Sequence, residues 1–467
     1  MRADSAEKRL AKGAAVLSLG SFAAKVLGAL YRIPLTNLLG AAGLGLYQMV
    51  FPVYCILLDF AGAGLPCGLS KLVSENIAAG EEYKNSSLLK TALFSMLAAG
   101  FAAALFMAAL SRPLAKLQGN PLAAPAYAAL APAVLFVALL SCYRGLFQGY
   151  RKMAPTAVSQ IMEQLVKLIF GLALAALLMP DVPAAAAGAA FAVSLSELAA
   201  LAYLFFAWRR QEKRGVFAAS EKKEHWKNSF KSIVKICLPV TLVGVLLPFS
   251  QTADSFLILN ILKTYTDRAT ALYGLFSGGV LSVIGVPVSL CYGVAVAAVP
   301  YVSGRDGGEK KPFFAVWLTL ALAAAMGAAC FLLPDFIVRV LFFSLSAEDK
   351  ALAANLLRAL SPCIVTMSLL QTVNSLLIGK GRAYAPLLGM GLGVAAKIAL
   401  EIVLLPRAQM HIYGAAISLN VCYLVAVLVN LLYSIKGFGE KRIKPLPKED
   451  CSEGARRFAR KYKADHR

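Results

Sequence analysis

Two cations, Lys25 and Arg32, stand in a stretch of sequence that is otherwise apolar enough to cross a membrane. Seven residues at about 100° each bring them nearly onto one face of a helix, and Ser18, Ser21 and Gly28 share that face. A charge at membrane depth costs roughly 2.5–3.5 kcal/mol on insertion scales. The stripe is therefore expected to face protein or a water-filled cavity, where its cations could bind an anionic group.

A second polar stripe, at helical spacing, contains Gln160, Glu163, Gln164 and Lys167. Glu163 and Lys167 are four residues apart, so they could neutralise each other on their own helix. The alternative is that the whole stripe lines a cavity. Arg144, which precedes the stripe, could be an anchor at the membrane surface or a further cation of the same cavity. Together with Lys25 and Arg32, these five residues are candidate substrate-binding residues.

The second half of the chain carries Asp254, Lys397 and Glu401 inside apolar segments. An intramembrane carboxylate with polar neighbours is a candidate carrier of a proton or a sodium ion, and Lys397 is also spaced to pair locally with Glu401. Asp59 and Glu197 are expected to balance nearby cations. The sequence shows no Ser/His/Asp or Cys/His set and no metal-ligand spacing, so we expect neither an enzyme nor a metal site.

The composition predicts an all-α polytopic membrane protein. The 467 residues are 59% hydrophobic and 15% charged, whereas soluble domains are about 45–50% apolar and about 25% charged. The net charge of +22 resides in short loops and in the tail, which fits the positive-inside rule and excludes a nucleic-acid partner. The nine cysteines are scattered singly and indicate packing rather than disulfides.

About twelve segments have the length and apolarity of membrane-spanning helices. Basic residues recur in every second loop and at both ends of the chain, so we expect a protein of the cytoplasmic membrane with both termini in the cytoplasm. The expected spans are 13–36, 44–66, 88–110, 123–147, 156–179, 185–208, 233–260, 271–300, 313–334, 354–378, 384–405 and 412–434.

The chain also carries a weak internal repeat. Leu46-Tyr47 recurs as Leu272-Tyr273, Gly188-Ala189-Ala190 recurs as Gly414-Ala415-Ala416 at the same spacing, and Lys167 corresponds to Lys397. Six spans per half keep the two halves in the same orientation, which predicts a parallel repeat of two six-helix lobes. The predicted organisation is an N-terminal lobe over 1–208, a basic cytoplasmic linker over 209–232, a C-terminal lobe over 233–434 and a basic cytoplasmic tail over 435–467.

Two motifs are more specific than this class. One is Gly45-Leu46-Tyr47-Gln48-Met49-x-x-Pro52 followed by Gly64-Leu65-Pro66-x-x-Leu69-Ser70-Lys71. The other is Arg144-Gly145-Leu146-Phe147-Gln148-Gly149, continuing through Pro155-Thr156-Ala157-x-Ser159-Gln160-x-x-Glu163-Gln164. With these motifs the sequence resembles the stage V sporulation protein B group of polysaccharide-biosynthesis proteins, in the multidrug/oligosaccharidyl-lipid/polysaccharide exporter superfamily.

That resemblance implies a V-shaped pair of lobes and a flippase for lipid-linked saccharides, such as the peptidoglycan precursor lipid II. It also implies alternating access, with the first-lobe cations neutralising a pyrophosphate. No bound cofactor is expected, and the drive would be a proton gradient, a sodium gradient or the membrane potential. Expected partners are the substrate, membrane lipids and cell-wall synthases. The alternatives are a cation-coupled multidrug antiporter of the same superfamily and a non-transporting scaffold for cell-wall synthesis.

Overall fold

The computed structural model describes residues 2–60, 64–213, 229–234, 237, 241, 244–291, 310–379, 382 and 384–436, with side chains of the first helix from residue 20 and of the 310–332 helix from residue 314. Most of the predicted linker and all but the first two residues of the predicted tail fall outside these residues. The described residues form helices and short turns, and no strand occurs among them.

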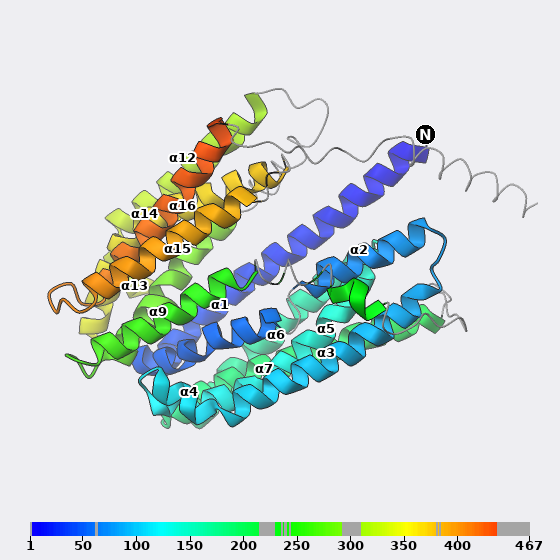
Figure 1. Ribbon diagram of the computed structural model, residues 1–467. Helices are drawn as coiled ribbons and strands as arrows, with labels where there is room; N and C mark the ends of the chain where they lie inside the picture. The colour runs from blue at the N-terminus through cyan, green and yellow to red at the C-terminus, as the bar shows by residue number, and fades with distance from the viewer. Residues whose placement is uncertain are drawn as a thin grey trace, which may run out of the picture.

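The N-terminal lobe is a bundle built from nearly the first half of the chain (Figure 1). Within it, α6 packs against α7, and α5 packs against both α3 and α7. The elements are α1 (Arg2–Leu58), α2 (Leu65–Ala78), α3 (Lys84–Ala109), α4 (Ser111–Leu117), η2 (Pro121–Ala123), α5 (Ala124–Gly149), α6 (Met153–Leu178) and α7 (Val182–Lys213).

The C-terminal lobe is a second bundle that lies beside the first (Figure 1). Here α15 packs on α16 and α9, and α14 packs on α12 and α16. The elements are α9 (Leu246–Leu262), α10 (Ala269–Tyr273), the π-helical segment η3 (Gly274–Val280), α12 (Lys310–Leu332), α13 (Pro334–Leu341), α14 (Ala347–Gly379), α15 (Tyr384–Leu404) and α16 (Tyr413–Lys436).

Helix α1 is two membrane-length arms rather than one. Its turn lies at Gly40, whose φ of 65° is a left-handed conformation that glycine adopts without steric cost. Arg32 and Phe51 line the same cavity, although a straight helix would hold them about 28 Å apart. Ten of the described helices are long and apolar enough to span a membrane. Counting both arms of α1 and the shorter α9 separately gives the expected twelve.

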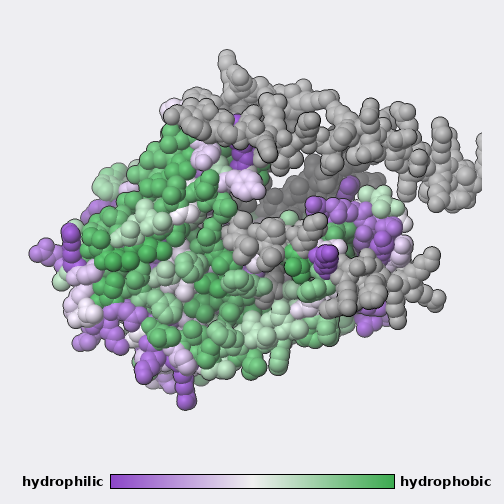
Figure 2. Space-filling model, viewed as in Figure 1, coloured by the Kyte–Doolittle hydropathy of each residue, from purple (hydrophilic) through white to green (hydrophobic). Residues whose placement is uncertain are grey.

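The surface agrees with a membrane environment. Figure 2 shows hydrophobic residues covering the sides of the molecule, with hydrophilic residues gathered toward its two ends. The exposed side chains of the band include Phe94, Phe101 and Phe106 on α3 and Trp317 on α12. Because lipid tails are as apolar as these side chains, their exposure carries no hydrophobic cost in a bilayer.

The lobes meet tightly at the end that carries α4, α9 and α13, and they diverge toward the end that carries the N-terminus (Figure 1). At the closed end a Cβ built on Gly45 would lie 2.0 Å from the Thr270 carbonyl oxygen, and one built on Gly274 would lie 2.3 Å from that of Ala41. The fully buried Gln118 amide crosses the same contact and donates to the Ser255 hydroxyl at 2.9 Å. We call this contact the closed-end seal.

Candidate functional site

A cavity of about 630 Å³ lies between the lobes and is lined by every residue predicted to bind substrate. We call it the cationic cavity. Four cations and one carboxylate are among its lining residues. The polar side chains of the lining are those of Ser21, Lys25, Tyr31, Arg32, Tyr47, Arg144, Gln160, Glu163, Gln164, Lys167, Ser282 and Ser289, and Gly28 and Gly285 also line the cavity.

The two polar stripes face each other because the first arm of α1 packs along α6. Ser21 donates a hydrogen bond from its hydroxyl to the Gln160 side-chain oxygen at 2.7 Å. About two helical turns after Ser21, a Cβ built on Gly28 would lie 3.0 Å from the Gln164 side-chain oxygen. Because Gly28 has no side chain, there is room for that amide. The pairing turns two separate stripes into one polar wall.

Glu163 pairs with Arg144 rather than with Lys167. The Arg144 guanidinium lies 3.1 Å from the Glu163 carboxylate, and it also donates to the Ser159 hydroxyl at 3.2 Å. The interpretation of Glu163 and Lys167 as a local pair is therefore wrong, and so is that of Arg144 as a surface anchor. The side chains of Arg144 and Glu163 are only 15% and 17% exposed, so their pairing shields both charges in the protein.

Lys167 is held by an aromatic ring instead of a carboxylate. Its ammonium nitrogen lies 5.8 Å from the centre of the Tyr31 ring, within the range of a cation–π contact. Among the described residues it makes no ion pair. Because no salt bridge to a described residue has to be broken first, Lys167 can attract an anion directly.

The two residues predicted to balance charge differ in their surroundings. Glu197 on α7 is 5% exposed and interacts electrostatically with Glu163, Arg144 and Lys167, but it is not among the residues that line the cationic cavity. Asp59, just past the end of α1, makes no ion pair with any described residue, and its carboxylate faces Gly244. The role assigned to each remains a prediction.

In the C-terminal lobe, Lys397 is neutralised across helices. Its ammonium lies 2.6 Å from the Asp254 carboxylate on α9 and donates to the Ser250 hydroxyl at 2.5 Å. The salt bridge of Lys397 is therefore with Asp254 on another helix and not, as its spacing suggested, with Glu401 on its own helix. Glu401 is 1% exposed and interacts electrostatically with both Asp254 and Lys397. The three predicted ion-coupling residues thus form one buried cluster of two acids and one base.

Lys167 and Lys397 occupy corresponding positions in the two lobes but have different partners. Lys167 on α6 and Lys397 on α15 each stand on the fifth long helix of a lobe, packed against the first, α1 or α9. In the N-terminal lobe the first helix offers the ring of Tyr31, whereas in the C-terminal lobe it offers the carboxylate of Asp254. One lysine therefore stays available to an anion, and the other is compensated.

Sequence reasoning missed the contribution of the C-terminal lobe to the cationic cavity. Ser282, Gly285 and Ser289 line it from the opposite side, and the Arg32 guanidinium donates across the lobes to the Ser282 hydroxyl at 3.1 Å. These residues recur at positions i, i+3 and i+7, the spacing of one helix face. This spacing is the feature of the sequence from which the three residues could have been predicted to line a cavity. Among the described residues, no cluster of acidic, histidine or cysteine side chains could hold a metal ion.

Comparison with known families identifies the chain. Residues 10–305 match the family described as polysaccharide biosynthesis protein. The chain belongs to this family. It is 28% identical to stage V sporulation protein B of Bacillus subtilis over 450 residues, covering 92% of this chain and 83% of the relative. It is 25% identical to lipid II flippase MurJ of the same organism over 454 residues, covering 91% and 82%.

Solved structures of low sequence identity show the same fold. Lipid II flippase MurJ in an inward closed conformation superimposes with a TM-score of 0.72 at 13% identity, covering 90% of this chain and 87% of that one. An inward-facing multidrug resistance MATE family transporter of the MOP superfamily gives 0.68 at 15% identity, covering 89% and 93%. The polysaccharide biosynthesis family member described here is therefore a multi-pass membrane protein with the two-lobed exporter fold.

Proposed function

We propose that this protein is a flippase that moves lipid-linked saccharides across the cytoplasmic membrane by alternating access. The observation that carries the proposal is the cationic cavity, in which Lys25, Arg32, Arg144 and Lys167 surround a single carboxylate. A lipid-linked saccharide carries its negative charge on a pyrophosphate between lipid and sugar. The excess of cations over carboxylates in this cavity suits such a group.

The arrangement favours a substrate that binds and leaves. At an effective dielectric constant of 20, one cation 4 Å from a phosphate charge contributes about 4 kcal/mol before desolvation. The Arg144 charge is already offset by Glu163 at 3.1 Å, and the remaining cations are distributed along α1 and α6. Several partial contacts can replace the hydration of a pyrophosphate without holding it in a closed pocket.

The relatives support the substrate class. One relative is named a lipid II flippase and another a sporulation protein, so a peptidoglycan precursor of the lipid II type is the proposed cargo. With both termini in the cytoplasm, as the loop charges predict, the closed-end seal would lie on the outer side and the described state would face inward. A cation-coupled drug antiporter is disfavoured because four lining cations would repel a cationic drug.

We further propose the cluster of Asp254, Lys397 and Glu401 as the site of a coupling proton. Two carboxylates and one ammonium leave an excess negative charge when all are ionised, and a buried uncompensated charge is costly. One bound proton would neutralise the cluster. Sodium coupling and the membrane potential, which supplies about 2.3 kcal/mol per charge at 100 mV, are the alternatives. Cell-wall synthases remain proposed partners.

The test is a flipping assay with purified protein in vesicles and a fluorescent lipid-linked saccharide. Lys25→Ala, Arg32→Ala and Lys167→Ala should each slow flipping at least tenfold, because each removes a lining cation. Lys116→Ala is the matched control, since Lys116 is exposed on α4 and away from the cavity. Full activity in all three cavity variants, or no flipping by the unaltered protein, would refute the proposal.

A further inference from the structure

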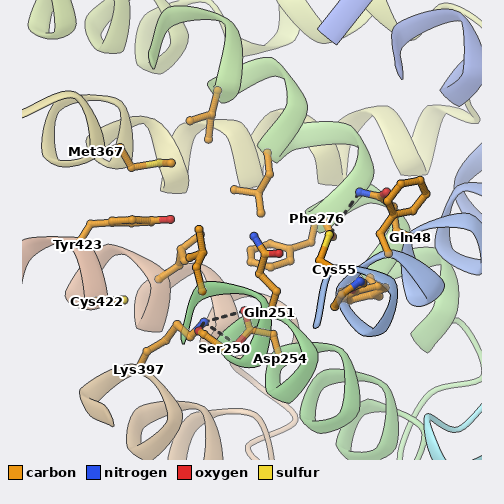
Figure 3. A pocket seen from close by; sticks show the side chains of 18 of the residues that line it. Gln48, Cys55, Ser250, Gln251, Asp254, Phe276, Met367, Lys397, Cys422 and Tyr423 are labelled. Atoms are coloured by element: carbon orange, nitrogen blue, oxygen red, sulfur yellow. Dashed lines mark hydrogen bonds and ion pairs between the residues drawn. The ribbon is translucent and has the colours of Figure 1, made fainter. Parts of the chain in front are cut away.

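A second cavity, of about 280 Å³, adjoins the cationic cavity between the lobes. Arg32, Phe51 and Leu281 line both cavities. The second cavity is shaped by α1, α9 and η3 together with α14, α15 and α16 (Figure 3). Its size falls just below the range of about 300–1,000 Å³ that is typical of sites for drug-sized ligands, so it suits one small unit rather than a whole oligosaccharide.

The second cavity differs from the first in charge. Its own ionisable pair, Asp254 and Lys397, is joined at 2.6 Å and so contributes little net charge. Arg32, at the junction with the cationic cavity, is the remaining charged residue among its lining residues. The first cavity therefore suits an anion, whereas the second suits a neutral polar group.

The remaining lining combines flat apolar surfaces with amides and hydroxyls. This mixture of a largely apolar wall and a few placed polar groups is typical of small-molecule sites. The aromatic and thioether side chains are Phe51, Tyr273, Phe276, Met367, Met390 and Tyr423, and the neutral polar ones are Gln48, Ser250, Gln251 and Ser277.

Gln251 is placed to contact an occupant. Figure 3 shows its side chain reaching into the cavity between Phe276 and Tyr423. It is exposed, and its amide makes no hydrogen bond with the described residues. A primary amide both donates and accepts, as a sugar hydroxyl does. The Gln48 amide, 3.5 Å from the Ser277 hydroxyl, adds a second group of the same kind.

The order of the two cavities matches the order of groups in the proposed substrate. Lys25 and Arg32 are seven residues apart on the first arm of α1, about 10 Å along its axis, and Arg32 stands where the cavities join. A pyrophosphate bound along these cations would bring the next covalently attached group to the second cavity. In a lipid-linked saccharide that group is the first sugar.

We propose that the second cavity is a saccharide subsite that receives the sugar attached to the pyrophosphate, with Gln251 and Gln48 as hydroxyl partners. This inference rests on the proposed flippase function and extends it. It assigns charge recognition to the cationic cavity and sugar recognition to the second one. It also predicts that the protein distinguishes a glycosylated lipid pyrophosphate from the bare one.

The test compares two probes on the purified protein, polyprenyl pyrophosphate and the same lipid carrying one N-acetylhexosamine. Gln251→Leu should weaken binding of the glycosylated probe roughly 2- to 10-fold, the range of one lost hydrogen bond, and leave the bare probe within twofold. Gln409→Leu, in the exposed turn between α15 and α16, is the matched control. Lys167→Ala should weaken the binding of both probes.

The outcomes separate the two proposals. If the unaltered protein binds neither probe, the flippase proposal falls and the subsite falls with it. If the unaltered protein binds both probes, two results would refute the subsite alone. Gln251→Leu would either weaken the binding of both probes equally or leave the binding of both unchanged. Gln251→Asn keeps the amide and should recover part of the lost affinity. If Asn behaves like Leu at this position, hydrogen bonding by the amide is refuted.

Discussion

The closed-end seal predicts that one methyl group can reset the conformational equilibrium. In Gly274→Ala the new Cβ would lie 2.3 Å from the Ala41 carbonyl oxygen and 2.5 Å from the Gly45 amide nitrogen. Real Cβ atoms essentially never come this close to other heavy atoms, and both neighbours are backbone, so the lobes must separate by roughly 1 Å. Overpacking of this kind costs about 1–3 kcal/mol.

This cost applies only while the seal is closed, because the contact joins different lobes. The substitution should therefore shift the ratio of open to closed seal by about 5- to 150-fold. Genetically encoded spin labels at Arg112 on α4 and Arg339 on α13, both exposed, would report the separation of the lobes at this end. We expect Gly274→Ala to transfer population from the shorter to the longer distance.

The matched control is Gly391→Ala on α15. A Cβ built on Gly391 meets nothing within 4 Å, so this variant gains the same helix propensity, about 1 kcal/mol, without touching the seal. If the distance distributions of Gly274→Ala and Gly391→Ala both equal that of the unaltered protein, the reasoning about the seal is refuted. Thermal unfolding of both variants would show whether either has lost its fold.

Three further predictions concern charged groups. Lys397→Met should lower the free energy of unfolding by about 3–5 kcal/mol in a chemical unfolding assay at neutral pH, because it leaves the Asp254 charge buried without its partner. Adding Asp254→Leu should recover most of that loss, and equal stability of the single and double variants would contradict the buried pair. Tyr31→Leu should weaken binding of lipid pyrophosphate several-fold, through loss of the ring that positions Lys167, while Tyr31→Phe should bind normally; loss in both would show that the hydroxyl matters instead. Arg268→Ala should change unfolding free energy by less than about 1 kcal/mol, since its pairing on the C-terminal lobe is partly exposed, and a larger loss would show that the pair anchors the lobe.

The sequence alone determined the membrane class, the twelve apolar helices and the polar stripes. It could do so because a charge in hydrocarbon is so costly that Lys25 and Arg32 are informative without any coordinates. Helical periodicity then groups each stripe on one face. The same logic selected the seven candidate residues that line the cationic cavity. Whether they bind substrate remains a proposal.

Partner choice was decided only by the tertiary structure. Glu163 is one turn from Lys167 in the chain, yet Arg144 on α5 reaches it at 3.1 Å. Lys397 is one turn from Glu401, yet Asp254 on α9 lies closer. Local spacing shows which charges can meet on one helix. It cannot show which neighbouring helix brings a better partner, because that depends on how helices distant in sequence pack.

The same limit applies to Lys167. Its sequence context predicted either a neutralised lysine or a cavity cation, and both readings fit the spacing. The fold places Tyr31 beside it and gives its counterpart Lys397 a carboxylate instead. The sequence therefore supplied the charges, and the packing of α1 on α6 and of α9 on α15 decided which charge stays available, since only that packing sets what faces each lysine.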